Sequence, residues 1–252
     1  MDERAKEQLK ADIIQKRGFW SPMHENLINI DPAALEAYLE YVTASSAHLS
    51  EKLRHLLFMA ADASVTHLFE FGIRLHMDLA MQCGATKEEV FEVLQLLLET
   101  CGLGSRVGMP ILAEELKRAG RESELQPQRA LTERQARARD LYRQHMGHWP
   151  EWLDLAMHVA PDFGEAFVEL AMKPWRESAL DAKTKAFVLI AVYSAPTMRN
   201  EEYLREYIRL ALTHGASALE ISEVMQTASV ISIHTYSVGV PILRELMKKN
   251  GG

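Results

Sequence analysis

The stretch Val107-Gly108-Met109-Pro110-Ile111-Leu112 returns later in the chain as Val238-Gly239-Val240-Pro241-Ile242-Leu243, so the offset in numbering is 238 − 107 = 131. The same offset carries Gly84-Ala85-Thr86 to Gly215-Ala216-Ser217, with no gap between the two blocks. Across 84–110 and 215–241, nine of twenty-seven aligned positions are identical, far more than two unrelated segments would share. Solenoid repeats have periods of about 20–50 residues, so a period this long indicates a duplicated domain.

The composition is that of an ordinary globular protein and excludes several functional classes. Hydrophobic residues make up 48% and charged residues 25% of the 252 residues. The net charge is −7 and the basic residues form no cluster, so we expect no nucleic-acid partner. No uninterrupted apolar run approaches the roughly 20 residues that a membrane span needs, so we expect no membrane partner.

Further signals favour a cytoplasmic location. The N-terminus, Met1-Asp2-Glu3-Arg4, is polar and lacks the apolar core of a signal peptide. The two cysteines, Cys83 and Cys101, do not suggest a disulfide framework and are expected to pack as small apolar residues.

Helical spacing of apolar residues dominates the chain, and convincing strand alternation is absent from the sequence. Asp31-Pro32 is a typical helix start, and Thr86 with Glu89 forms a predicted capping box. The first-half helices are expected at 33–42, 49–63, 64–83, from 86 onward and from Pro110 onward. The second-half helices are expected at 162–172, 180–194, 200–214, 217–229 and 241–249.

The predicted fold class is all-α, with two tandem helical bundles related by the offset described above. The predicted domains are a first repeat at 18–117, a polar connector with a helix at 118–147, and a second repeat at 148–249. The connector is rich in Arg, Glu and Gln and contains Pro127. Since acidic residues are mixed through it, we interpret it as a solvated linker.

The order of motifs in each half resembles the carboxymuconolactone decarboxylase family, which includes AhpD-like alkyl hydroperoxidases. The matching motifs are Leu49-Ser50-Glu51-Lys52-Leu53-Arg54, a helix with His76, and Gly84-Ala85-Thr86 at the start of the next helix. Upstream, Arg17-Gly18-Phe19-Trp20 and Asp31-Pro32 are similar to the leaders of such domains. The resemblance implies an AhpD-like bundle that forms homo-oligomers; for a tandem chain a trimer is favoured.

The family's redox motif, Glu-x11-Cys-x-x-Cys-x-x-x-His, does not survive in this chain. Counting back from His76, the two cysteine positions hold Phe69 and Gly72. In the second half Tyr207 replaces the histidine, with Asn200 and Tyr203 in the cysteine positions. A thiolate is the nucleophile of this chemistry, so a peroxidase-related antioxidant activity is disfavoured.

His76 and His55 are the candidate catalytic residues. His76 is the one functional position of the family that matches, and His55 stands near the position of the family's glutamate. An imidazole exchanges protons near neutral pH and is a suitable acid–base group for a decarboxylation. The alternatives are that His76 is a satisfied core histidine and that His55 is a partly exposed surface residue.

Four further residues are candidates for binding substrate: Arg106, Tyr207, His234 and Tyr236. Arg106 lies in a glycine-bearing stretch and suits a carboxylate, or else an interface salt bridge. Tyr207 is either a pocket hydroxyl or a large side chain that closes an obsolete second site. His234 and Tyr236 either mark a second-half pocket or form a hydrogen-bonded core pair.

The resemblance predicts a thiol-independent lyase acting on a small lactone or carboxylic acid, with one working pocket in the first half. The alternative, from another class, is a non-catalytic binding or scaffold protein that kept the fold. No cofactor is expected. No metal is expected either, because His145 and His148 share one side of a turn but no third ligand follows at a suitable spacing.

Overall fold

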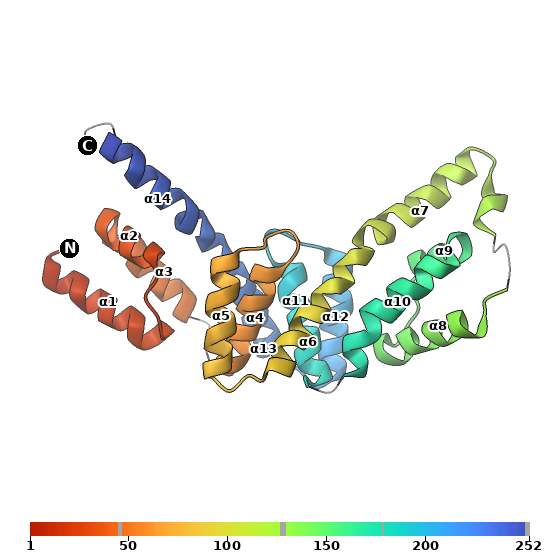
Figure 1. Cartoon of the computed structure of the whole chain (residues 1–252), viewed down its shortest axis with the longest axis horizontal. Coiled ribbons are helices and arrows are strands. Elements are labelled where there is room, and N and C mark those ends of the chain that lie inside the picture. The colour runs from red at the N-terminus through yellow and green to blue at the C-terminus, as the bar shows by residue number, and fades with distance from the viewer. Residues whose placement is uncertain (45–46, 127–129, 178, 250–252) are drawn as a thin grey trace.

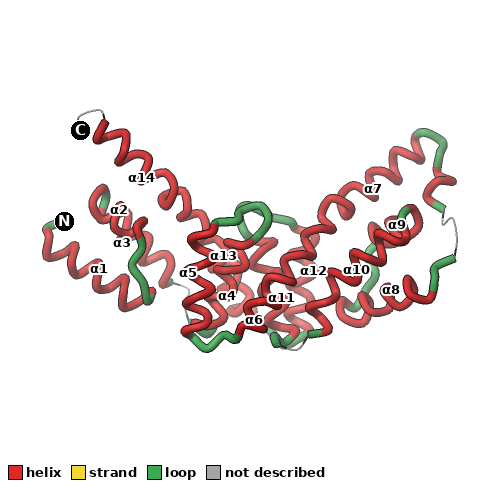
Figure 2. Tube along the Cα trace, in the orientation of Figure 1, coloured by secondary structure: helices red, strands yellow, loops and turns green. Residues whose placement is uncertain are grey.

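The computed structural model describes residues 1–44, 47–126, 130–177 and 179–249, and these residues form helices joined by loops, with no strand among them (Figure 2). The all-α prediction is confirmed. The first seven α-helices are α1 (Glu3–Arg17), α2 (Pro22–Ile30), α3 (Pro32–Thr43), α4 (Glu51–Ala63), α5 (Glu70–Gln82), α6 (Lys87–Leu96) and α7 (Leu103–Arg118). The other seven are α8 (Glu133–Met146), α9 (Glu151–Val159), α10 (Pro161–Arg176), α11 (Ala182–Ser194), α12 (Glu201–Thr213), α13 (Ala218–Ser229) and α14 (His234–Lys249). Short 3₁₀ helices are η1 (Leu97–Gly102), η2 (Glu122–Leu125) and η3 (Val230–Ile233).

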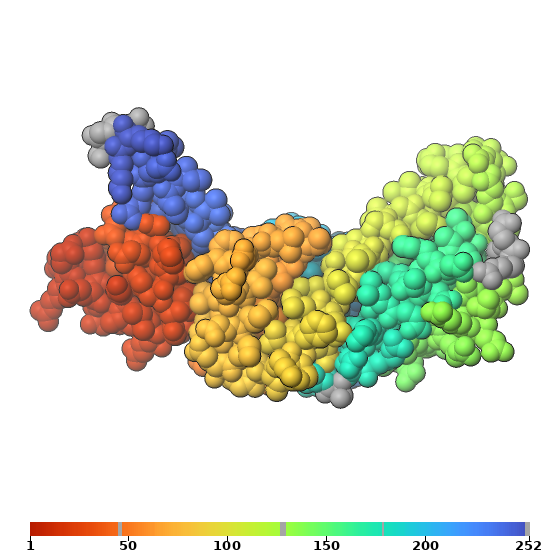
Figure 3. Space-filling model, viewed as in Figure 1, coloured from red at the N-terminus to blue at the C-terminus, as the bar shows by residue number. Residues whose placement is uncertain are grey.

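The molecule has a central helical bundle with an arm at each end (Figure 1). The bundle contains α4, α5, α6, α11, α12 and α13. One arm joins α14 to α1–α3, and the other joins α7 to α8–α10 (Figure 1). Because α7 and α14 rise out of the bundle at opposite ends, the space-filling view is concave along its upper edge (Figure 3).

The helices of the bundle repeat with the offset seen in the sequence. The starts of α4, α5, α6 and α7 each return, at that same offset, as the starts of α11, α12, α13 and α14. The halves also exchange helices: α7 of the first half packs against α9, and α14 of the second half packs against α2. We interpret the pattern as a duplication in which each half completes the other's arm.

Two ion pairs at equivalent positions join the halves inside the bundle. Lys185 Nζ lies 2.7 Å from Glu92 Oε1, and both side chains are almost fully buried. At the related positions, Arg54 lies 3.5 Å from Glu223, and the Arg54 side chain is 20% exposed. Each pair therefore connects one half to the other, but the first is tighter and drier.

Predicted helix ends agree with the structure where capping chemistry is local. Thr86 Oγ1 accepts a hydrogen bond from the Glu89 backbone N–H at 3.1 Å, and the Thr86 N–H donates to the Glu89 carboxylate at 2.8 Å. Ser217 and Glu220 form the equivalent capping box at the start of α13. These reciprocal bonds satisfy backbone groups that a helix end otherwise leaves without partners.

Three expectations about the helices are corrected. The predicted helix at 64–83 begins only at Glu70, because residues 64–69 form a turn in which the Phe69 N–H donates to the Asp62 carbonyl. Pro110 and Pro241 do not start helices; they lie inside α7 and α14, which begin at Leu103 and His234. Helices α1, α2 and α9 were not predicted from the sequence. Pro127 lies outside the described residues.

Among the described residues, one helical segment, Lys87–Arg118, is long and apolar enough by composition to cross a membrane, with a mean hydropathy of 1.2. This segment comprises α6, η1 and α7, and α6 packs against α4 and α11 of the bundle and against α10 of the adjoining arm. Core helices meet the same criterion, so the segment by itself is only weak support for a membrane protein.

Candidate active site

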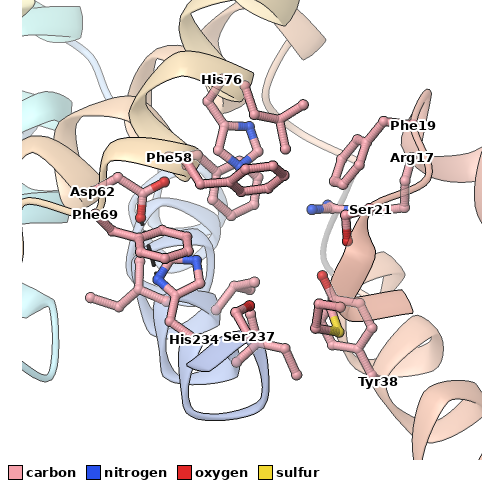
Figure 4. A pocket seen from close by; sticks show the side chains of 17 residues that line it. Arg17, Phe19, Ser21, Tyr38, Phe58, Asp62, Phe69, His76, His234 and Ser237 are labelled. Atoms are coloured by element: carbon pink, nitrogen blue, oxygen red, sulfur yellow. Dashed lines mark ion pairs between the residues drawn. The ribbon is translucent and has the colours of Figure 1, made fainter. Parts of the chain in front are cut away.

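A small cavity lies where α4 and α5 of the bundle meet the arm formed by α14 and α1–α3 (Figure 4). One wall comes from α4 and α5, with Phe58, Asp62 and His76. The facing wall comes from the arm of α1–α3, with Arg17, Phe19 and Tyr38 among its residues, and residues of η3 and α14 also line the cavity. The free volume is about 40 Å³, which is enough for a few water molecules or for part of a small ligand.

His76 and His55 form a pair at this cavity. His76 Nδ1 lies 3.1 Å from His55 Nδ1, so one ring donates a hydrogen bond and the other accepts it. His76 lines the cavity and is buried, with its ring stacked on Phe58 at 4.6 Å between centroids. His55 stands behind it, outside the lining and partly exposed. The pair therefore joins the cavity to a more exposed imidazole.

Both histidines are held in their neutral forms at pH 7. Burial lowers the pKa of His55 to about 4, and the nearby Arg17 and Arg54 guanidinium groups act in the same direction. Burial also holds the pKa of His76 well below its usual range, helped by His55 and Arg17. An anion in the cavity would oppose these effects and favour a protonated imidazole.

Arg17 supplies the positive charge of the cavity. It is the last residue of α1, and Gly18 follows in the left-handed conformation, with φ of 77°, that ends the helix. The guanidinium lies over the rings of Phe19 and Phe58, at 5.4 and 5.2 Å from their centroids. Figure 4 shows Arg17, Phe19 and Tyr38 across the cavity from His76 and Phe58. The sequence did not indicate Arg17 for this role, because the Arg17-Gly18 pair signals a helix end and not which cavity the arginine meets.

His234 also lines this cavity, beside a second cluster of polar side chains. His234 Nδ1 lies 2.7 Å from His67 Nε2, and Asp62 Oδ1 lies 3.6 Å from His234 and 3.8 Å from His67. Asp62 is buried, and burial raises the pKa of its carboxyl to about 8. Gly72 makes room for this carboxylate, because a Cβ there would lie 2.1 Å from Asp62 Oδ2. No local sequence motif indicated this cluster, because Asp62 and His67 are near each other in the chain but His234 comes from the other half.

Arg106 and Tyr207 are not brought to this cavity. Arg106 is buried, lies 2.9 Å from Glu206 and 3.1 Å from Glu202, and stacks on the Tyr203 ring. Tyr207 is buried in a parallel stack with Tyr193 and Tyr203, whose ring planes lie within 7° of one another. Tyr207 is at the position equivalent to His76, so side chains fill the corresponding region of the second half.

Tyr236 and the cysteines also lie elsewhere. Tyr236 is exposed and lines a groove that adjoins the cavity and shares Tyr38, Val230 and Ile233 with its lining. Cys83 and Cys101 are free and exposed, which corrects the expectation that both pack in the core. Neither belongs to the lining of the His76 cavity.

The fold and the site define an all-α protein of the AhpD-like fold with a histidine pair at its cavity and no adjacent dithiol in the lining. The model of the carboxymuconolactone decarboxylase family matches residues 32–107. A solved structure from Burkholderia xenovorans, described as that of a candidate gamma-carboxymuconolactone decarboxylase subunit, shares 32% identity. The match covers 97% of this chain and 98% of the other, with a TM-score of 0.89. Of the curated proteins compared, none matches the chain significantly. The chain belongs to the carboxymuconolactone decarboxylase family.

Proposed function

We propose that this protein is a thiol-independent decarboxylase acting on a small lactone or a related carboxylic acid. The observation that carries the proposal is the His55–His76 pair, with 3.1 Å between the two Nδ1 atoms, at a cavity whose wall includes the Arg17 guanidinium. Family membership supports the same reaction class. The Burkholderia xenovorans relative is described as a decarboxylase subunit, which favours this chemistry without identifying the substrate.

In the proposed reaction the bond between the carboxyl carbon and its neighbouring carbon breaks, and carbon dioxide leaves. The electron pair of that bond stays on the substrate, delocalised toward a carbonyl group. His76 then donates a proton to the carbon that lost the carboxylate. The product gains this proton, so charge and atoms balance once His76 recovers a proton from His55 and solvent.

The substrate's own charge prepares His76 for this role. Without substrate, both imidazoles are neutral because burial disfavours their charged forms. A bound carboxylate raises the pKa of His76 by favourable charge interaction, and His55 can pass a proton inward through their hydrogen bond. Protonation of His76 is thereby coupled to binding of the substrate carboxylate.

Arg17 is suited to an anionic group that the substrate keeps during the reaction. An ion pair with the departing carboxylate would stabilise the ground state more than the transition state, in which that charge is lost. An ion pair with a retained group orients the substrate at equal strength throughout. The aromatic rings of Phe19 and Phe58 around Arg17 exclude water and strengthen such a contact.

One working site per chain is part of the proposal. The second-half residues equivalent to His76 and His55 are Tyr207 and Ala186, and both are buried. Tyr207 stacks with Tyr193 and Tyr203 at the place where the first half has the His76 imidazole. The second half therefore contributes α14 to the active cavity but supplies no second acid–base pair.

The test combines binding and turnover. A thermal-shift screen of small lactones and carboxylic acids of aromatic breakdown would be run on the parent, His76→Asn and Arg17→Met, followed by measurement of carbon dioxide release. We expect hits that raise the parent's melting temperature, because a ligand of the folded state stabilises it. Arg17→Met should weaken binding, whereas His76→Asn should keep binding and lose at least about 100-fold in turnover, the usual scale of acid–base catalysis.

His158→Gln on α9, in the other arm, is the matched control and should turn over normally. Full turnover by His76→Asn would refute the assignment of the proton donor. Ligand binding without carbon dioxide release from any hit would instead favour the non-catalytic binding protein. A cysteine-free variant with unchanged turnover is expected, and loss of turnover there would restore thiol chemistry as the leading alternative.

A further inference from the structure

Three potential metal ligands from the two halves of the chain converge beside the cavity. Asp62 lies in the last turn of α4, His67 lies on the loop before α5, and His234 is the first residue of α14. One ligand atom from each lies within 4.8 Å of the others. The turn after α4 places Asp62 and His67 near each other, and tertiary packing adds His234 of α14 to them.

The Asp62 carboxylate has the environment of a ligand rather than of a surface acid. Its residue is 1% exposed, and Oδ1 accepts no hydrogen bond although it faces both imidazoles. A buried carboxyl oxygen without a hydrogen-bond partner is costly, and a bound cation, which takes the place of the carboxyl proton, is one way to offset that cost. Gly72 lies against the other oxygen and leaves no room for a side chain.

The loop that carries His67 is held in an uncommon conformation. Within the described part of the chain, Leu68 is the one residue other than glycine with a positive φ, at 46°. A bulky side chain seldom adopts this conformation, and Leu68 itself is 62% exposed, so the strain does not serve to bury it. The backbone turn instead directs His67 and Phe69, its two neighbours, toward His234.

We propose that Asp62, His67 and His234 form a binding site for one divalent transition-metal ion, with Zn²⁺ as the favoured ion. The ligand atoms are Asp62 Oδ1, His67 Nε2 and His234 Nδ1. Nitrogen and oxygen ligands of tetrahedral zinc, at about 2.0–2.2 Å, stand about 3.3–3.6 Å apart. The observed separation of 3.6 Å lies within this range and that of 3.8 Å just above it, whereas the two histidine nitrogens, at 2.7 Å, must move apart by about 0.6 Å to reach it.

We infer that an open fourth position of the ion would lie toward the cavity. Asp62 and His234 both line it, together with His76, and Figure 4 shows all three on the same side of the space. Two histidines and one carboxylate with an open position are typical of catalytic rather than structural zinc sites. The metal site does not depend on the proposed decarboxylase function, because binding can be measured without substrate.

The duplicated half provides an internal comparison. At the offset of the duplication, the equivalents of Asp62, His67 and His234 are Tyr193, Met198 and Leu103. Tyr193 is fully buried, and its hydroxyl donates to Glu99. None of these three offers a histidine or carboxylate ligand, so the proposal predicts one ion per chain and not two.

The test is titration of the chelator-treated full chain with Zn²⁺ by calorimetry and with Co²⁺ by visible absorption. We expect one equivalent to bind and the Co²⁺ complex to show the intense absorption of a tetrahedral site. His234→Leu and His67→Met use the residues that the chain itself has in its other half. Each should weaken binding by at least about 100-fold, more than the usual effect of losing an outer-shell partner.

His214→Gln is the control, because His214 lines a different groove with His145 and His148. Binding lost in this variant but kept in His234→Leu would move the ion to that groove and overturn the assignment. Absence of saturable binding would leave His67 and His234 as a hydrogen-bonded pair that shares a proton, which also overturns it. His76→Asn should bind metal normally, so failure of the decarboxylase proposal would not be confused with failure of this one.

Discussion

Removing the charge of Glu92 is expected to destabilise the protein far more than the same change at its equivalent, Glu223. Glu92 pairs with Lys185 at 2.7 Å, and the two side chains are 2% and 4% exposed. Glu223 pairs with Arg54 at 3.5 Å, where the arginine side chain is 20% exposed. The two positions are related by the duplication, so each substitution is a control for the other.

The magnitude follows from what each variant leaves behind. Glu92→Gln leaves the Lys185 ammonium buried, and losing one member of a buried pair costs about 3–5 kcal/mol. Lys185 keeps hydrogen bonds to the carbonyls of Pro174 and Glu177, both at 2.8 Å, so we expect the lower end, about 3 kcal/mol. Glu223→Gln leaves an arginine that reaches solvent, and we expect about 1 kcal/mol.

Thermal unfolding followed by circular dichroism measures the difference. At this chain length about 1 kcal/mol corresponds to about 2–4 °C, so Glu92→Gln should lower the melting temperature by about 6–12 °C and Glu223→Gln by about 2–4 °C. Both variants are compared at one protein concentration, because association changes apparent stability. Equal losses, or a loss below about 1 kcal/mol for Glu92→Gln, would refute the argument from burial.

Three further predictions concern pH, packing and association. Burial lowers the pKa of His24 to about 4, so the unfolded chain gains a proton below pH 6.5 that the folded chain does not. The free energy of unfolding should therefore fall as the pH falls from 6.5 to 4. His24→Gln keeps the capping-box acceptor, and its free energy of unfolding in urea should fall by about 2 kcal/mol less than that of the parent between pH 7 and 5. Equal decreases in the two proteins would contradict burial of His24 as the cause. Gly72→Ala places a Cβ against Asp62 and should lower the free energy of unfolding in urea by about 1–3 kcal/mol. Gly104→Ala is the control, because its Cβ meets open space, and it should not lower the free energy of unfolding. Equal effects of the two substitutions would argue against a steric clash at Gly72. The apolar residues Val107, Ile111, Val238 and Ile242 are exposed on the two arms, and we expect them to mediate assembly of a trimer. Light scattering of Ile111→Asp/Ile242→Asp should give a smaller mass than the parent, and a monomeric parent would exclude this assembly.

Much of the helical framework was accessible from local sequence. The capping boxes at Thr86 and Ser217 determine helix starts through residues three apart, and the structure has both. The predictions were wrong where local signals were ambiguous. Pro110 is a typical first residue of a helix, but it lies within α7, since a helix can accept the loss of one backbone hydrogen bond. The polar N-terminal residues have no strong apolar period, and α1 was missed.

The candidate site was predicted only in part. The family resemblance identified His76 and His55, and the structure has them 3.1 Å apart. It could not indicate that Arg17 faces the same cavity or that Arg106 is taken up by Glu202 and Glu206. Which arginine meets a cavity depends on how an arm folds back onto the bundle, and no local pattern encodes that.

Three properties of this protein follow from its sequence alone: the chain is helical, its motifs repeat at a constant offset, and the paired cysteines of the family's redox motif are absent from it. The spacing of apolar residues indicates the helices, the identical residues in the two halves indicate the repeat, and the residues at the two motif positions show that the cysteines are absent. Tertiary packing was needed to show that α14 of the second half closes a cavity in the first, and that His234 meets Asp62 and His67 there. A helix buries its apolar face against any partner that fits, so the choice between neighbours depends on packing across the whole molecule and is not encoded in any one segment.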